Sequence, residues 1–111
     1  MIPATTLSYI LEGQTPVAQP DPNAWRDWMR ASQTDGRRVV AKTQITAHLE
    51  ISTVFTGMDR GPAGSPGFDR PVVFETATLE DGEIIETRGY ETWDEALAGH
   101  AALVTALTPT T

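Results

Sequence analysis

Polar and apolar residues alternate strictly along one stretch near the middle of the chain. One side of this stretch carries Leu49, Ile51, Thr53 and Phe55, and the other carries Glu50, Ser52, Val54 and Thr56. A period of two is typical of a strand with one face in the core. The stretch reaches Gly57 and then enters a loop rich in Gly and Pro. We therefore predict a central strand within residues 49–60 and place a candidate site at its C-terminal end.

Three further segments repeat this pattern. Val39, Ala41, Thr43 and Ile45 alternate with Val40, Lys42 and Gln44, and the short break at 46–48 predicts a hairpin into the central strand. Residues 71–79 alternate as well, with Val72, Phe74, Thr76 and Thr78 on one side. The Asp81-Gly82 pair then predicts a tight turn into a fourth strand over 84–90. These four strands should form an antiparallel meander.

Two helices are predicted, one before and one after the meander in the sequence. Asp21-Pro22 is a typical helix start, and Gly36 can end that helix in the left-handed conformation. Thr92 and Glu95 form a capping box at the start of the second helix, which Thr108-Pro109 should end. The face of the first helix carries Trp25, Trp28, Met29 and Ser32, and that of the second carries Trp93, Ala96, Leu97, His100, Leu103, Val104 and Leu107.

The predicted fold class is α+β: a four-stranded antiparallel meander with an N-terminal and a C-terminal helix packed on one face, in the order α-β-β-β-β-α. A length of 111 residues suits one domain. We expect an extended arm over residues 1–20, the domain over 21–108 and a frayed tail over 109–111. The open face of the sheet would then be the working surface.

Charge and composition narrow the classes of partner. The net charge is −7, and residues 69–111 carry the excess with nine acidic and two basic side chains. The negative electrostatic field of these charges disfavours binding to nucleic acid and to membrane surfaces and favours binding to basic partners. No run approaches the roughly 18 apolar residues of a membrane helix, and no basic segment opens a signal peptide, so we expect a cytoplasmic protein. The chain has no cysteine, which excludes disulfides and thiolate chemistry.

His100, Asp59 and Glu75 are the candidates for chemistry. His100 lies within an apolar helix stripe, so it should face the sheet and require a hydroxyl or carboxylate partner. With the two acids it could bind a metal or act as a general base. The structural alternative is that His100 is a core hydrogen-bonding residue, that Asp59 caps the strand exit and that Glu75 pairs with Arg88 across a hairpin.

Other polar features give weaker indications. Gly61, Gly64 and Gly67 could cradle a phosphate, but Pro62 and Pro66 each remove an amide donor, which favours a simple connection. Ser65 lies in G-S-P-G, outside a serine-hydrolase elbow. His48 falls in a predicted turn and should be a surface residue.

Four segments of the chain are distinctive: Y-I-L-E-G-Q-T-P-V near the start, S-T-V-F-T-G-M-D (52–59), F-E-T (74–76) and Y-E-T-W-D-E-A-L-A-G-H (90–100). They resemble segments of a group of small, largely uncharacterised proteins encoded by bacteriophages and prophages. Members of the group carry a histidine after the aspartate, where this chain has Arg60. The resemblance implies a viral origin and an accessory role in the host cytoplasm, a class that includes inhibitors of host defence.

The sequence therefore leads to three functional hypotheses. The first is a non-catalytic binding protein without cofactor or metal, whose partner is a host protein or a small charged ligand. Its candidate binding residues are Thr53, Asp59, Arg60, Glu75, Arg88, Tyr90 and Trp93. The second is a small hydrolase or metal-dependent enzyme that uses Asp59, Glu75 and His100. The third is a structural module that forms homo-oligomers through exposed sheet edges.

Overall fold

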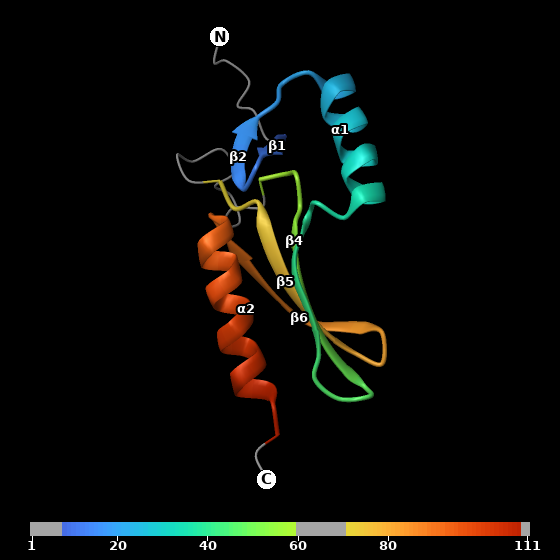
Figure 1. Ribbon diagram of the computed structural model, residues 1–111, viewed down its shortest axis with the longest axis vertical. Coiled ribbons are helices and arrows are strands. Elements are labelled where there is room, and N and C mark those ends of the chain that lie inside the picture. Colours follow the sequence, from blue (N-terminus) through green and yellow to red (C-terminus); the bar gives the residue numbers. More distant parts are fainter. Residues whose placement is uncertain (1–7, 60–70, 110–111) are drawn as a thin grey trace.

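The computed structural model describes residues 8–59 and 71–109, which form two helices and six strands (Figure 1). The predicted α+β class is confirmed. A two-stranded hairpin and a helix precede the four-stranded sheet, and a second helix follows it. The elements are β1 (Tyr9–Glu12), β2 (Thr15–Ala18), α1 (Pro22–Asp35), β3 (Val39–Gln44), β4 (Leu49–Phe55), β5 (Phe74–Glu80), β6 (Glu83–Tyr90) and α2 (Trp93–Leu107).

The sheet is the predicted antiparallel meander, in the order β3-β4-β5-β6. The Asp81-Gly82 turn has positive φ at both residues, 51° and 84°, as the tightest hairpin turns require. On β4, Ile51, Thr53 and Phe55 are all fully buried, so the predicted alternation is confirmed there.

Two β-bulges shift the register from that of regular hairpins. In β3, Val39 pairs with Val54 and Ala41 pairs with Thr53, so Val40 is the extra residue. Val40 consequently packs against the core, whereas Val39 is exposed, so Val39 does not share a face with Ala41 and Thr43 as the alternation predicted. In β6, Leu79 pairs with Ile84 and Thr78 pairs with Glu86, which leaves Ile85 as the extra residue.

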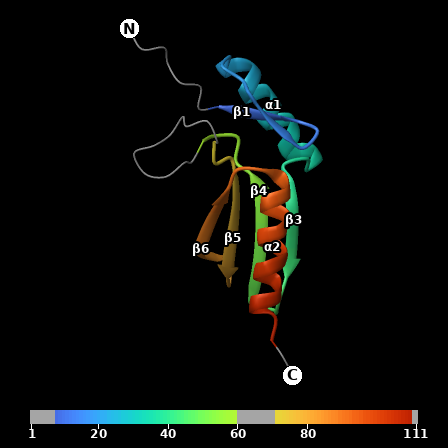
Figure 2. The ribbon, with the colours of Figure 1, turned by 90° about the vertical axis from the view of Figure 1, so that its left-hand side faces the viewer.

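The C-terminal helix α2 runs lengthwise over one face of the sheet (Figure 2) and contacts all four of its strands. Thr92 caps its first turn, since the Thr92 Oγ1 accepts a hydrogen bond of 3.0 Å from the Glu95 amide. Ala96, His100 and Leu103 are buried against the sheet. Leu97 was predicted to share this stripe, but it is 45% exposed because it lies on the flank of the helix.

The N-terminal helix α1 lies beyond one end of the sheet in both views (Figures 1 and 2). Its predicted caps are confirmed, because the Asp21 side chain accepts from the Asn23 amide and Gly36 has φ of 74°. Trp28 reaches the core and packs edge-on against Phe55, with ring centroids 5.7 Å apart. The aromatic contacts continue from Phe55 to Phe74 at 5.4 Å and from Phe74 to Trp93 at 6.1 Å.

The first 20 residues contain an element that the sequence did not indicate. Within the expected arm, β1 and β2 pair as a short hairpin around Gly13, whose φ is 63°. The hairpin is held to the body by the Trp25 indole N–H, which donates to the Tyr9 carbonyl at 3.1 Å and to the Gly57 carbonyl at 3.0 Å. The Tyr9 amide also donates to the Gly57 carbonyl at 2.8 Å.

Candidate functional site

His100 lies in a buried chain of hydroxyl groups between α2 and the sheet. Its Nε2 is 2.8 Å from the Thr43 Oγ1, and its Nδ1 is 2.7 Å from the Thr53 Oγ1. Thr53 in turn lies 2.6 Å from the Thr76 Oγ1. His100 is only 4% exposed, and Thr53 and Thr76 are 0% and 1% exposed. The expectation of a hydroxyl partner for His100 is thus confirmed.

This arrangement satisfies a neutral imidazole. A neutral ring has one N–H donor and one acceptor nitrogen, and a threonine hydroxyl both donates and accepts. With the proton on Nδ1, the hydrogen bonds can run from Thr43 through His100 and Thr53 to Thr76, and with the proton on Nε2 they can run in the reverse direction. Burial also lowers the pKa of His100, which favours the neutral ring. Both ring nitrogens are engaged within the core, so the geometry supports the structural reading of His100.

The two acids that were grouped with His100 lie elsewhere. Asp59 follows the end of β4, where its Oδ1 accepts from the Val72 amide at 3.0 Å, as the structural alternative expected. Glu75 is adjacent to the buried Thr76 on β5, so its side chain is on the opposite face of the sheet from His100. The structure does not bring the three residues together. No group of three His, Cys, Asp or Glu side chains in the described part of the chain is placed to hold a metal ion.

The expected pairing of Glu75 with Arg88 is wrong, and the bulge at Ile85 is the reason. A regular two-residue hairpin at Asp81-Gly82 would set Glu75 opposite Arg88, but the extra residue sets it opposite Gly89. Arg88 instead lies opposite Thr76 and forms an exposed 2.8 Å ion pair with Glu86. Because side chains alternate along a strand, Glu75 and Arg88 lie on opposite faces of the sheet.

The remaining predicted binding residues differ in how accessible they are. Thr53 is fully buried and cannot contact a partner directly. Tyr90 is half-buried over α2, where a Cβ at Gly99 would overlap its ring. Trp93 is half-buried and lines a cavity of about 240 Å³ with Gln14, Thr15, Pro16, Thr92 and Asp94. Arg60, Ser65 and the glycines of the 61–68 loop lie outside the described residues.

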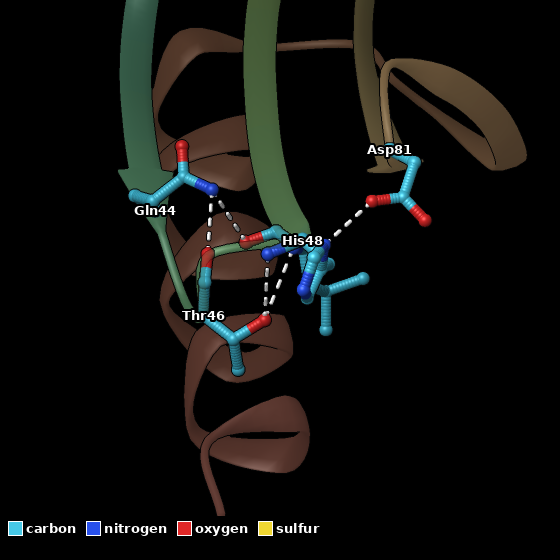
Figure 3. A network of polar contacts seen from close by, with 5 residues as sticks. Gln44, Thr46, His48 and Asp81 are labelled. Atoms are coloured by element: carbon cyan, nitrogen blue, oxygen red, sulfur yellow. Dashed lines mark hydrogen bonds and ion pairs between the residues drawn. The ribbon is translucent and has the colours of Figure 1, made fainter.

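His48 belongs to a polar network at the other end of the sheet (Figure 3). Its Nδ1 lies 2.7 Å from the Asp81 Oδ1, and its carbonyl accepts from the Asp81 amide at 2.7 Å. The Thr46 Oγ1 accepts from the amides of His48 and Leu49, both at 3.1 Å. The His48 side chain is 75% exposed, as predicted for a surface residue. The network joins the two hairpin turns and is structural.

The sheet face opposite α2 is an accessible surface. The register places three cross-strand rows on it: Val39, Val54, Glu75 and Gly89; Lys42, Ser52, Ala77 and Thr87; and Gln44, Glu50, Leu79 and Ile84. We call this surface the open face. No described helix or strand covers it (Figures 1 and 2). Ile84 is 61% exposed, and Ile85 beside it on the edge strand is 57% exposed.

A second cavity, of about 170 Å³, adjoins one end of the open face. It lies where the last turn of α1 meets β3 and β4. Its lining residues are Ser32, Gln33, Gly36, Arg38, Val39 and Val54. This cavity could not be predicted from the sequence, because Arg38 directly follows Arg37 in a segment that is typical of a surface turn.

Comparison with known proteins adds no assignment: no family model, curated protein or solved structure matches the chain. None of the helices in the described ranges, 8–59 and 71–109, is long and apolar enough to span a membrane. The function must therefore be argued from the surfaces described above.

Proposed function

We propose that this protein is a non-catalytic binding protein that receives a basic protein partner on its open face. The observation that carries the proposal is the bare face of a sheet whose other face packs against α2. A sheet with one covered face normally exposes mostly polar side chains on the other face. Here the uncovered rows include Val54, Ala77, Leu79 and the exposed Ile84.

Charge indicates the kind of partner. Glu50 and Glu75 both lie on the open face. The Glu50 carboxylate is 3.8 Å from the Lys42 ammonium group, which offsets one of these charges. The two outer rows each place an apolar pair beside a glutamate, Val39 and Val54 next to Glu75, and Leu79 and Ile84 next to Glu50. This pattern suits a partner whose apolar side chains are accompanied by Lys or Arg, because opposite potentials favour encounter and register.

The resemblance to phage-encoded proteins supports a wider form of the proposal. In that form the partner is a protein of the bacterial host, the binding takes place in the host cytoplasm, and the outcome is inhibition of a host defence system. The buried position of His100, with both ring nitrogens bonded to threonine hydroxyls, supports binding over hydrolysis.

The test places a long charged side chain in the centre of the open face. Ala77 lies in the middle row between Ser52 and Thr87, so Ala77→Arg adds both bulk and positive charge there. Ala101→Arg is the matched control, since Ala101 is exposed on α2. Bead-coupled wild type and both variants are incubated with host lysate, and captured proteins are quantified by mass spectrometry.

We expect one host protein to be retained by the wild type and by Ala101→Arg but reduced at least about tenfold by Ala77→Arg. The same protein should protect β4 and β5 from hydrogen exchange when it is added in purified form. Equal capture by Ala77→Arg, or no capture above uncoupled beads, would refute the proposal. A wild-type dimer in light scattering that Ala77→Arg converts to monomer would also refute it, by identifying a second copy as the occupant.

A further inference from the structure

The cavity of about 170 Å³ at the end of α1 contains a charged side chain whose hydrogen bonding is incomplete. The Nε of Arg38 is buried and has no hydrogen-bond partner. Buried polar atoms in folded proteins are nearly always bonded, so one that is not calls for an explanation. An arginine N–H cannot lose its proton to escape the cost of burial, since the guanidinium stays charged at all ordinary pH values.

The backbone around Arg38 is fixed, which holds the base of the side chain in place. The Gly36 amide donates to the Ser32 carbonyl at 3.0 Å and ends α1. The Val39 amide donates to the Gly36 carbonyl at 3.0 Å, and the Arg38 carbonyl accepts from the Phe55 amide at 2.8 Å. These hydrogen bonds fix the backbone of Arg38 between the end of α1 and the start of β3.

Neighbouring charges do not neutralise Arg38. Asp35 is the nearest acid in the sequence, and its carboxylate is 2.6 Å from the Arg37 guanidinium. Hydrogen bonds from Arg37 lower the pKa of Asp35, which keeps that carboxylate ionised and engaged. The Arg37 guanidinium also lies 5.6 Å from the centroid of the Trp28 ring. Arg38 forms no ion pair within the described chain.

The other lining groups indicate what kind of anion would fit. Gln33 supplies a carboxamide at the exposed rim, and Ser32 already donates its hydroxyl proton to the Met29 carbonyl at 3.0 Å. Val39 and Val54, a cross-strand pair, form an apolar wall. Inorganic phosphate would place polar oxygens against that wall. A carboxylate with a short aliphatic tail would place its oxygens on Arg38 and its methylene groups on the valines.

We propose that this cavity is a binding site for a small aliphatic carboxylate, held by Arg38 and seated against Val39 and Val54. Its volume exceeds that of one water molecule, about 30 Å³ in the liquid, by several times, so it can hold a few heavy atoms. The carboxylate belongs either to a free short-chain acid or to the C-terminus of a peptide. The site does not depend on the proposed docking of a protein on the open face, and its test uses the purified chain alone.

The test follows the Nε–Hε cross-peak of Arg38 in a ¹⁵N correlation spectrum during titration with sodium butyrate at constant ionic strength. Arg30, which is exposed on α1, is the internal control. We expect a saturable shift for Arg38 and only a weak linear drift for Arg30. Inorganic phosphate should bind more weakly than butyrate, and 1-butanol should not move the Arg38 cross-peak.

Variants extend the test to the role of the guanidinium. The amide signals of Val39 and Val54 report binding when the Arg38 signal is absent. Arg38→Gln should weaken butyrate binding by about tenfold or more, because a charge-assisted hydrogen bond is lost, whereas Arg30→Gln should not change it. Arg38→Lys keeps the charge but removes the planar fork, and we expect an intermediate affinity.

The proposal is overturned if the Arg38 cross-peak drifts as Arg30 does, or if phosphate binds as tightly as butyrate. It is also overturned if Arg38→Gln and Arg30→Gln bind butyrate equally well. The wild-type titration needs no variant, so a misfolded variant does not remove the test. A tripeptide ending in valine is then compared with its amidated form: tighter binding than butyrate by the free acid alone identifies a peptide C-terminus, and equal or weaker binding identifies a free acid.

Discussion

Thr53→Val is the sharpest test of the buried network around His100. Valine has nearly the same shape as threonine, so the packing of this fully buried position changes little while the hydroxyl is lost. Two hydrogen bonds disappear, at 2.7 Å to the His100 Nδ1 and at 2.6 Å to the Thr76 Oγ1. Both partners are then left in the core without that contact.

The magnitude follows from these two bonds. A neutral hydrogen bond contributes about 0.5 to 1.5 kcal/mol net, and a buried group left without a partner costs about 1 to 3 kcal/mol. We therefore expect Thr53→Val to lower the free energy of unfolding by about 2 to 4 kcal/mol. Thr53→Ser keeps the hydroxyl and removes one methyl group, so it should cost only about 1 kcal/mol.

Thr78 provides the matched control. It lies on the same face of the sheet and is 3% exposed, but its side chain makes no hydrogen bond within the described chain. Thr78→Val should therefore change the free energy of unfolding by less than about 0.5 kcal/mol. Comparison of Thr53→Val with Thr78→Val separates the hydrogen bonds from any general effect of valine at a buried strand position.

Urea unfolding followed by tryptophan fluorescence is the assay, since the chain has three tryptophans. With a slope of about 2 kcal/mol per molar urea, the midpoint for Thr53→Val should fall by about 1 to 2 M. Equal midpoints for Thr53→Val and Thr78→Val would refute the reasoning. A double-mutant cycle with His100→Leu should give a coupling energy of about 1 kcal/mol, because the two residues share one bond.

Three further outcomes are expected. Thr92→Ala should cost about 1 kcal/mol of unfolding free energy, because it removes the cap of α2, and an unchanged urea midpoint would contradict this. Gly57→Ala should cost about 1 to 2 kcal/mol from its φ of 77° alone, and more because the added Cβ would lie 2.6 Å from the Met29 Sδ; thermal unfolding measures it. Because burial lowers the pKa of His100 in the folded chain, unfolded chains bind the proton first as the pH falls below about 6.5. The contribution of His100 to stability is thus complete above that pH and declines below it. Between pH 7.5 and pH 5, the free energy of unfolding should therefore fall by more for the wild type than for His100→Gln.

Much of the fold could be predicted from local signals that act within a few residues. The alternation in β4, the caps Asp21 and Thr92 and the Asp81-Gly82 turn each specify their own structure without help from distant segments. The hydroxyl partners of His100 could be anticipated as a class, since a histidine within an apolar stripe must be satisfied. Their identity required the register of β3 and β4.

The predictions that were wrong depend on shifts of one residue in the pairing of the strands. Val39 and Val40 are both apolar, so nothing in the sequence tells which of them a bulge will turn outward. Ile85 likewise follows another isoleucine, so the sequence does not indicate which of the two is the extra residue. The bulge there places Gly89, and not Arg88, opposite Glu75. Because side chains alternate with a period of two, one extra residue reverses every later assignment on that strand. The cavity at Arg38 could not be predicted because it forms between three elements.

The Trp25 indole has a consequence for the order in which the chain folds. Each strand of the sheet pairs with the strand that precedes or follows it in the sequence, so the meander can form by successive pairing of adjacent strands. The contacts of Trp25 and Tyr9 with Gly57 instead close loops of 32 and 48 residues. Contacts between distant residues form slowly because the entropy of loop closure opposes them. The N-terminal hairpin and α1 should therefore dock last, onto a sheet whose β4 exit is already formed, and the single indole N–H that bridges Tyr9 and Gly57 marks the end of the folding reaction.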